Sequence, residues 1–194
     1  MRRSTAWRSF RPGAMAPAPE ALAAAAAGVR VLGLDPGSRA TGFGVVDTGR
    51  QGPRYVASGA IRTTGPELAD RLRQIYAGVA ALVAEYHPGE IAIERVFVSR
   101  NPDSALKLGQ ARGAALSATF GCPARIYEYS PRQVKKGVVG TGAAEKAQVQ
   151  RMVCVLLALE GRLGADAADA LAIALCHAHG RATRLALAAA GHRT

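Results

Sequence analysis

Four carboxylates stand at positions from which a fold could gather them. Asp35 and Glu94 each follow directly on a short apolar run, while Asp166 and Asp169 begin an alanine-rich stretch with a helical pattern. A carboxylate at the end of a buried strand costs on the order of several kcal/mol unless it is paired or bound to a metal. We therefore interpret the four side chains as one cluster of negative charge that requires cations.

The chemistry open to such a cluster is metal-assisted hydrolysis of a phosphodiester. Carboxylates with no His or Cys among them suit hard ions such as Mg2+ or Mn2+. Two ions about 3.5–4 Å apart can activate water on one side of a phosphodiester and stabilise the leaving oxygen on the other. Asp35 is the candidate bridging ligand, with Glu94 and Asp169 completing separate shells. Asp166 lies three residues before Asp169, so both project from one face of a helix.

Each acid also has a purely structural alternative. Asp35 precedes Pro-Gly, a sequence typical of turns. Glu94 could form an ion pair with Arg95 or Arg100, and the two acids at the helix start could act as caps favoured by the helix dipole. The metal interpretation therefore depends on the joint occurrence of the acids with the ends of two strands.

A second group of residues is basic and could hold a phosphate backbone. Residues 132–151 carry a net charge of +4, and three glycines among them allow a phosphate to approach the backbone closely. Such contacts give affinity with a steep salt dependence but little sequence choice. The alternative is an ordinary solvated pair of helices. The cations are Arg132, Lys135, Lys136, Lys146 and Arg151.

The segment after Glu94 supplies two more candidate DNA contacts. Phe97 lies in a predicted loop beside the acids, where an aromatic ring could stack on an unpaired base. Arg100 lies in the same segment and is a candidate contact to DNA. A core position under the loop is the structural alternative for Phe97.

Composition favours a single basic domain that binds a polyanion. The 194 residues carry a formal net charge of +11, and 49% of them are hydrophobic, enough to fill a core. Residues 29–180 remain basic despite the four acids, which favours nucleic acid as partner, although a composition rich in Arg and Ala gives the same sign. No apolar run approaches the roughly 18–20 residues of a membrane span.

Cysteine usage and the termini complete the outline. Three widely spaced cysteines indicate a reducing cytoplasm, and Cys176, His177 and His179 lie too close along one helix to share a face for zinc. We expect residues 1–28 to be a disordered extension or a wrongly chosen start, residues 29–180 to form the folded domain, and residues 181–194 to be a basic tail of uncertain order.

Apolar runs and turn signals predict the elements that must position these residues. We expect strands at 31–34, 42–47, 54–61, 90–94 and 124–128, and helices from 66 to about 87 and at 101–120, 130–138, 143–159 and 166–180. Three meandering strands followed by alternating helix and strand predict a mixed sheet covered on both faces. With the first strand central, Asp35 is expected beside Glu94.

With these residues identified, the chain resembles the RuvC family of Holliday-junction resolvases. Any one of the shared motifs is weak, but five in order at fitting separations are specific. They are LDPGSRATGFG (34–44), IERVF (93–97), SPRQVKK (130–136), VGTGAAEKAQV (139–149) and DAADALAIA (166–174). The N-terminal extension departs from the family, whose first strand comes close to the start of the chain.

The resemblance implies an α/β, RNase H-like fold with a five-stranded mixed sheet, and a homodimer. It implies a crossover junction endodeoxyribonuclease that nicks four-way DNA junctions symmetrically, with the four acids holding Mg2+, two ions per subunit, or Mn2+ as a substitute. It further implies a cytoplasmic enzyme of recombination and repair that works with the junction-binding protein RuvA and the branch-migration ATPase RuvB. The DNA contacts that it implies are Lys135, Lys146 and Phe97.

Other functions remain open at this level. The Asp-x-Gly turn after the first strand also occurs in ATPases of the actin and sugar-kinase type, although these need two lobes. A non-catalytic DNA scaffold and an RNase H-like nuclease acting on RNA are further alternatives. For the dimer contact, the helix 104–120 is a candidate because its small residues permit close packing, while core packing within one subunit is the alternative.

Overall fold

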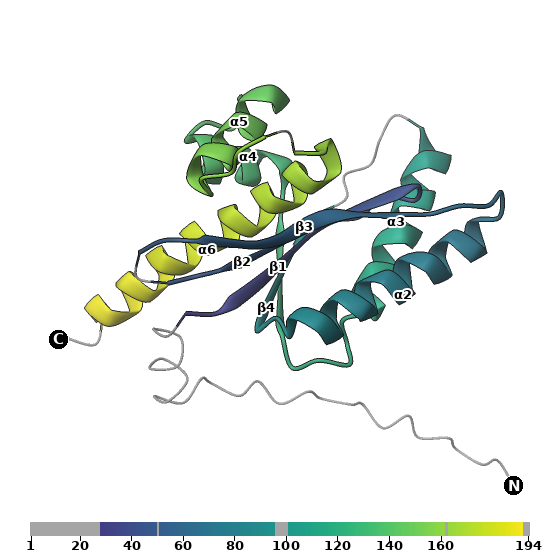
Figure 1. The fold of residues 1–194 in the computed structure, drawn as a ribbon, viewed down its shortest axis with the longest axis horizontal. Coiled ribbons are helices and arrows are strands. Elements are labelled where there is room, and N and C mark those ends of the chain that lie inside the picture. Colours follow the sequence, from purple (N-terminus) through teal and green to yellow (C-terminus); the bar gives the residue numbers. More distant parts are fainter. Residues whose placement is uncertain (1–27, 50, 96–100, 162, 192–194) are drawn as a thin grey trace, which may run out of the picture.

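The computed structural model describes residues 28–49, 51–95, 101–161 and 163–191. In these ranges the chain forms a five-stranded sheet with helices on both faces (Figure 1). The strands are β1 (Arg30–Asp35), β2 (Ala40–Asp47), β3 (Arg54–Arg62), β4 (Glu90–Glu94) and β5 (Arg125–Tyr129). The helices are α2 (Leu68–Tyr86), α3 (Pro102–Ser117), α4 (Pro131–Val139), α5 (Lys146–Leu156) and α6 (Ala165–Gly191).

The sheet combines antiparallel and parallel pairing. Its strand order is β3-β2-β1-β4-β5, so β1 lies at the centre. β1 pairs antiparallel with β2, and β2 with β3, whereas β1 pairs parallel with β4, and β4 with β5. The predicted mixed sheet with a central first strand is confirmed.

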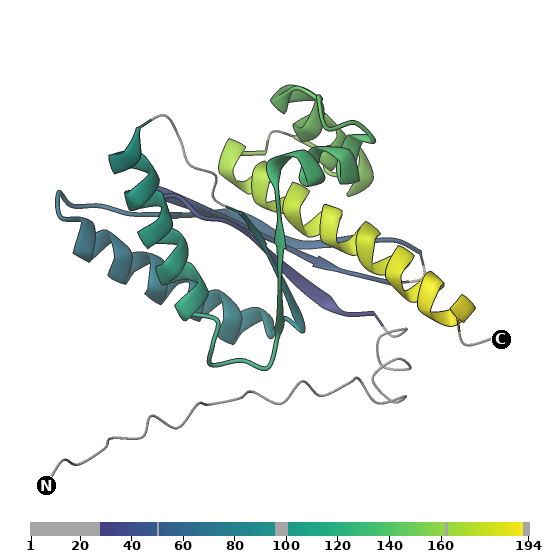
Figure 2. The ribbon, with the colours of Figure 1, turned by 180° about the vertical axis from the view of Figure 1, so that it is seen from behind.

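Alternating side chains divide the core into two layers, one on each face of the sheet. Leu32 and Leu34 of β1 pack with α2 and α3, while Val31 packs with α4, α5 and α6. In β4, Ile91 joins the α2–α3 layer and Ala92 the α6 layer. Figure 2 shows α6 crossing one face of the sheet, with α2 and α3 on the other side. Both Asp35 and Glu94 continue the alternation on the face that α6 covers.

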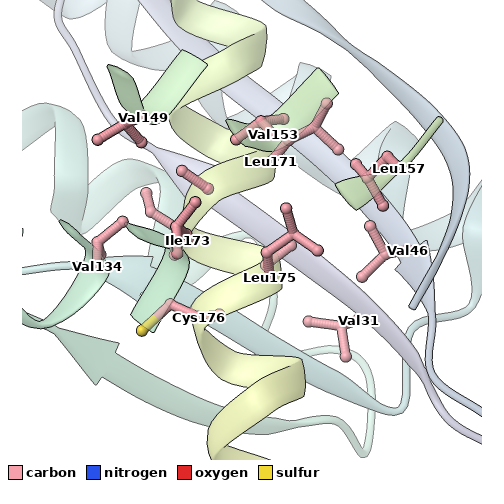
Figure 3. Packing of buried hydrophobic residues seen from close by; sticks show 14 of the residues in the cluster. Val31, Val46, Val134, Val149, Val153, Leu157, Leu171, Ile173, Leu175 and Cys176 are labelled. Carbon is pink, nitrogen blue, oxygen red and sulfur yellow. The ribbon is translucent and has the colours of Figure 1, made fainter. Parts of the chain in front are cut away.

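α6 lies unusually close to β1 and β2 because glycines and alanines meet at the contact. A Cβ atom added to Gly33 would come 2.3 Å from the carbonyl oxygen of Ala170, and one on Gly44 would come 2.7 Å from the backbone nitrogen of Leu171. Figure 3 shows the larger side chains of this layer, including Leu171 of α6 and Val46 of β2. The backbone of α6 therefore rests almost directly on the sheet.

Capping interactions determine where α4 and α5 begin. In α4, the Ser130 hydroxyl accepts from the backbone N–H of Gln133, whose side chain accepts from the backbone N–H of Ser130. In α5, the backbone N–H of Glu145 donates to the Gln148 side chain at 2.9 Å. α5 therefore begins three residues later than the helix predicted at 143–159, and it also ends three residues earlier.

The ends of two other helices also differ from expectation. α3 ends at Ser117 rather than near residue 120, and α6 continues past residue 180 as far as Gly191. Residues 1–27 of the expected extension lie outside the described residues. None of the helices that the structure describes combines the length and apolar character needed to cross a membrane.

A buried polar network ties α6 to β4 and β5 away from the carboxylates. His177 is fully buried, with Nδ1 2.7 Å from the Tyr129 hydroxyl and Nε2 2.5 Å from the Glu90 carboxylate. Arg181 donates to the same carboxylate at 3.2 Å, and the Tyr127 ring lies 4.5 Å from the imidazole. Both nitrogens of His177 are thus engaged in holding α6 on the sheet.

The contact between α6 and the sheet should not tolerate one added methyl group. We expect Gly33→Ala to lower the free energy of unfolding by about 1–3 kcal/mol, because the new Cβ overlaps backbone of α6 rather than a movable side chain. Urea denaturation followed by circular dichroism measures the change.

Gly113→Ala provides the control, because Gly113 lies within α3 and a Cβ there meets nothing within 4 Å. Alanine is the better helix former, so this variant should be unchanged or more stable by up to about 1 kcal/mol. A Gly33→Ala protein as stable as the Gly113→Ala protein would show that the contact is loose.

Candidate active site

Two of the predicted carboxylates lie side by side at one end of the sheet. Leu34 of β1 is opposite Ile93 of β4 in the parallel register, so the residues that follow, Asp35 and Glu94, are neighbours. Their side chains point to the face that α6 covers. The prediction that these two acids meet at the ends of adjacent strands is confirmed.

The first turns of α6 bring the other two acids to the same end of the sheet. A Cβ on Gly42, which lies opposite Asp35, would come 2.2 Å from the backbone oxygen of Asp166, so this part of α6 touches β2. Asp169, one turn further on, lines the same pocket as Asp35 and Glu94. Asp166 does not line that pocket, although its charge acts on Asp35.

Burial and like charge make these carboxylates hard to ionise. Burial, followed by the charges of Asp169 and Asp166, raises the pKa of Asp35 to about 6, against the opposing effect of Lys146. Burial, followed by the charges of Asp35 and Asp169, raises the pKa of Glu94 to about 7. A bound cation would remove this penalty, which fits an oxygen-only donor set for a hard divalent ion.

A lysine already lies at the cluster. Nζ of Lys146, at the first position of α5, is 2.5 Å from Oδ2 of Asp169. This hydrogen bond raises the pKa of Lys146, and Asp35 and Asp166 add to the effect. As the side chains stand, no group of three or more His, Cys, Asp or Glu residues within the described ranges is arranged to hold a metal ion.

The carboxylates form one wall of a pocket of about 250 Å³. Its polar side consists of Asp35, Glu94 and Asp169 together with Lys135 and Lys146. Its apolar lining comes from α4, α5 and α6, through Pro131, Val134, Val149, Ala172 and Ile173. The pocket therefore combines three carboxylates, which can hold hard cations, with two lysines and apolar side chains.

Comparison with known proteins identifies the family to which this site belongs. A family model described as Crossover junction endodeoxyribonuclease RuvC matches residues 31–177, a range that contains all four carboxylates and the basic helices. The chain belongs to the RuvC family.

Relatives within the RuvC family match over most of their length. The crossover junction endodeoxyribonuclease RuvC of Hahella chejuensis is 59% identical over 151 residues, which are 78% of this chain and 88% of that protein. The one from Chromohalobacter salexigens is 56% identical over 154 residues, 79% of this chain and 83% of that protein.

A solved structure supports the same assignment. Thermus thermophilus RuvC in complex with a Holliday junction substrate superposes with a TM-score of 0.75 at 34% identity, covering 81% of this chain and 97% of that one. The RNase H-like fold implied by the motifs is thereby confirmed.

The basic residues predicted to contact DNA differ in their distance from the pocket and in their exposure. Lys135 is half-buried and lines the pocket, whereas Lys136 is exposed one position further along α4. Arg132 is exposed and its side chain lies along Gly142. Phe97 and Arg100 lie outside the described residues.

The structure shows which ion pairs the acids and their expected partners form. Arg95, one possible partner of Glu94, lies 3.5 Å from Glu128 instead. The side chain of Asp169 is paired with Lys146, and that of Asp166 lies 3.9 Å from an arginine of β3, Arg62.

Sequence reasoning missed two parts of the site. The apolar lining of the pocket includes Val134 and Val149, which lie within two predicted helices but were not identified as site residues. Arg62 was missed because the third strand was expected to end at residue 61 and because the register between β2 and β3 was not deduced. Pairing residues outward from the turn after Asp35, first between β1 and β2 and then between β2 and β3, would have placed Arg62 near the acids.

Removing one buried charge should stabilise the metal-free protein at alkaline pH. The folded-state pKa values of Asp35 and Glu94, about 6 and about 7, exceed those of the unfolded chain. The folded protein therefore binds more protons near neutral pH, and it loses stability as the pH rises through these values. We expect Asp35→Asn to raise the Tm by a few degrees at pH 8 in EDTA, with the gain shrinking as the pH falls towards 4.

Asp47→Asn is the control with the opposite sign. A hydrogen bond from Arg30, with Nε 2.8 Å from Oδ1, lowers the pKa of Asp47, so this pair stabilises the fold above the unfolded-state pKa. Its removal should lower the Tm at pH 8. If Asp35→Asn melted like the parent protein at every pH, the carboxylates would not repel one another as described.

Proposed function

We propose that this chain resolves four-way DNA junctions by paired symmetric nicks, through phosphodiester hydrolysis supported by two divalent ions. The observation that carries the proposal is the grouping of Asp35, Glu94 and Asp169 on one pocket wall in a chain of the RuvC family. Thermus thermophilus RuvC has been solved with a Holliday junction substrate, and the likeness of the two structures supports the same class of substrate here.

Nucleases of this family are metal-dependent, and we assign Mg2+ to the present site, with Mn2+ as a substitute. Bound there, the ions would supply an activated water and stabilisation of the leaving oxygen. Asp35 neighbours Glu94 in the sheet, and Asp169 of α6 lines the same pocket, so these three carboxylates would hold the ions, with Asp35 as the candidate shared ligand. Asp166, the most peripheral of the four acids, would contribute charge or a ligand from the same helix face.

The basic residues would hold the scissile strand against this wall. Lys135 lines the pocket beside Glu94, and Lys146 reaches Asp169 from α5. With a metal neutralising the acids, the ammonium of Lys146 would be available to a phosphate of the strand. Arg132 and Lys136 are exposed on α4 and would contact phosphates further along. Phe97 and Arg100 remain candidates for contacts to the opened bases of the junction.

A homodimer would supply the second nick, because a junction has approximate two-fold symmetry and each subunit carries one site. Within α3, Ala111 and Ala115 are buried in the core, which accounts for part of the small-residue pattern. Leu106 is 63% exposed on the same helix and is a candidate for the subunit contact. We further propose a cytoplasmic enzyme that acts with RuvA and RuvB.

A nicking assay tests the reaction class and the substrate together. An immobile synthetic four-way junction and a linear duplex of the same arm sequence would be incubated with the protein, with and without Mg2+. We expect symmetric cuts in opposed strands of the junction only, and only with the divalent ion. Equal cutting of the duplex, or cutting in EDTA, would contradict the proposal.

Neutralising a carboxylate should separate cutting from binding. We expect Asp35→Asn and Asp169→Asn to reduce the nicking rate by at least about 100-fold, because a metal ligand is lost. Junction affinity measured in Ca2+ or EDTA should be kept or increased, because a negative charge near the phosphates is removed.

Asp103→Asn is the matched control, an exposed helix acid that is paired with Lys107 and does not line the pocket. It should nick like the parent protein. Asp35→Asn and Asp169→Asn proteins that fold but lose binding and cutting equally would argue against a catalytic role for these acids.

A further inference from the structure

Arg62 lies at the rim of the carboxylate site on the side of β3. Two residues earlier in the strand, Ala60 is opposite Gly42, which is itself opposite Asp35 in β1. Arg62 therefore belongs to the same face of the sheet as Asp35. Its Nη2 lies 3.9 Å from Oδ2 of Asp166, and its side chain is 76% exposed.

The end of β3 is fixed to the turn between β1 and β2. The backbone N–H of Thr63 donates to the carbonyl of Arg39 at 3.0 Å, and the Thr63 hydroxyl donates to the carbonyl of Ser38 at 3.0 Å. The exposed Arg39 is thereby held next to the strand end that carries Arg62. The strand end that carries Arg62 is thereby fixed relative to the turn that follows Asp35.

The predicted cations lie on the other side of the acids. β3 is one edge of the sheet and β5 the other, with Asp35 and Glu94 on the two strands between β2 and β5. α4, which carries Lys135, follows β5 directly, and α5 places Lys146 on Asp169. The carboxylates therefore lie between the lysines of α4 and α5 on one side and Arg62 of β3 on the other.

The pairing of Arg62 with Asp166 does not by itself account for this arginine. At 3.9 Å and with both groups reached by solvent, such a pair adds little to stability. A guanidinium has five N–H donors in a planar fork that matches phosphate, and most of them are left to other acceptors here.

We propose that Arg62 binds the phosphate backbone of the DNA strand on the side of the acids remote from Lys135 and Lys146. The strand then crosses the carboxylates while being held at both ends. This arrangement is needed because the acids repel phosphate, and a strand anchored on one side alone would swing away from them. The proposal rests on the junction-resolving function proposed above.

The salt dependence of junction binding tests the contact. Binding would be measured without divalent ions from low to moderate salt for the parent protein, Arg62→Ala and Arg62→Lys. We expect Arg62→Ala to weaken binding several-fold and to reduce the slope of log K against log salt by about 1 for each arginine that contacts DNA. Arg62→Lys should keep most of the slope, because it keeps the charge.

Arg54→Ala is the matched control. Arg54 is an exposed arginine at the other end of the same strand, where it lies near Asp47 rather than the carboxylates. It should bind like the parent protein. An Arg62→Ala protein with the parent affinity and slope would overturn the proposal.

A second measurement distinguishes two reasons for weaker binding by Arg62→Ala: loss of a direct contact between Arg62 and a phosphate, or loss of the positive charge that neutralises Asp166. Single phosphates on each side of the cut would be replaced by neutral methylphosphonates. We expect replacements on one side to weaken the parent protein but not Arg62→Ala, while Lys135→Ala loses sensitivity on the other side. If Arg62→Ala responded to every replacement as the parent does, or if adding Asp166→Asn restored its full affinity and slope, Arg62 would not contact DNA.

The failure of this inference is distinguishable from failure of the proposed function. A parent protein that neither binds nor nicks the junction would remove the function itself. A parent protein that nicks the junction normally, together with an Arg62→Ala protein indistinguishable from it in salt slope, would remove only the role of Arg62.

Discussion

The site depends on one packing constraint, the direct contact of α6 with β1 and β2. Glycines at 33, 42 and 44 leave no side chain between the strands and the helix backbone, so the first turns of α6 rest on the sheet. This contact sets the distance between Asp35, at the end of β1, and the two acids of α6. A helix separated from the sheet by ordinary side chains would lie several ångströms further away, and its acids would then interact with solvent rather than with Asp35.

The same contact brings like charges close together, which lowers the stability of the fold. The raised pKa values of Asp35 and Glu94 show that these carboxylates would be more stable apart or neutral. Lys146 offsets part of the repulsion through Asp169, and the buried network around His177 holds α6 in place from its other half. The stabilising polar network therefore lies away from the acids. The end of the sheet that carries the acids keeps an electrostatic repulsion that a divalent ion can relieve.

Much of this arrangement follows from local sequence signals, and the remainder does not. The strand ends at Asp35 and Glu94, the capped start of α4 and the strand order were predictable because each depends on neighbouring residues or on a general rule of topology. The start of α5 was misjudged because Ala143 and Ala144 favour a helix as strongly as the residues after them. The cap at Glu145, which makes the helix begin at Lys146, was not recognised. The engagement of His177 and the position of Arg62 depend on strand register and helix rotation, which join residues far apart in the chain and leave no periodic trace.

A site whose own charge repels its substrate must obtain affinity from residues other than those that cut. In the proposed function, the acids of β1, β4 and α6 would repel the strand until cations occupy them, whereas Lys135 would attract it throughout and Lys146 would attract it once a cation frees it from Asp169. The acids and these two lysines come from different elements. This separation would explain why a basic chain can carry a strongly acidic centre: the surrounding positive charge draws the strand in, and the cluster then acts on a phosphate that is already held in place.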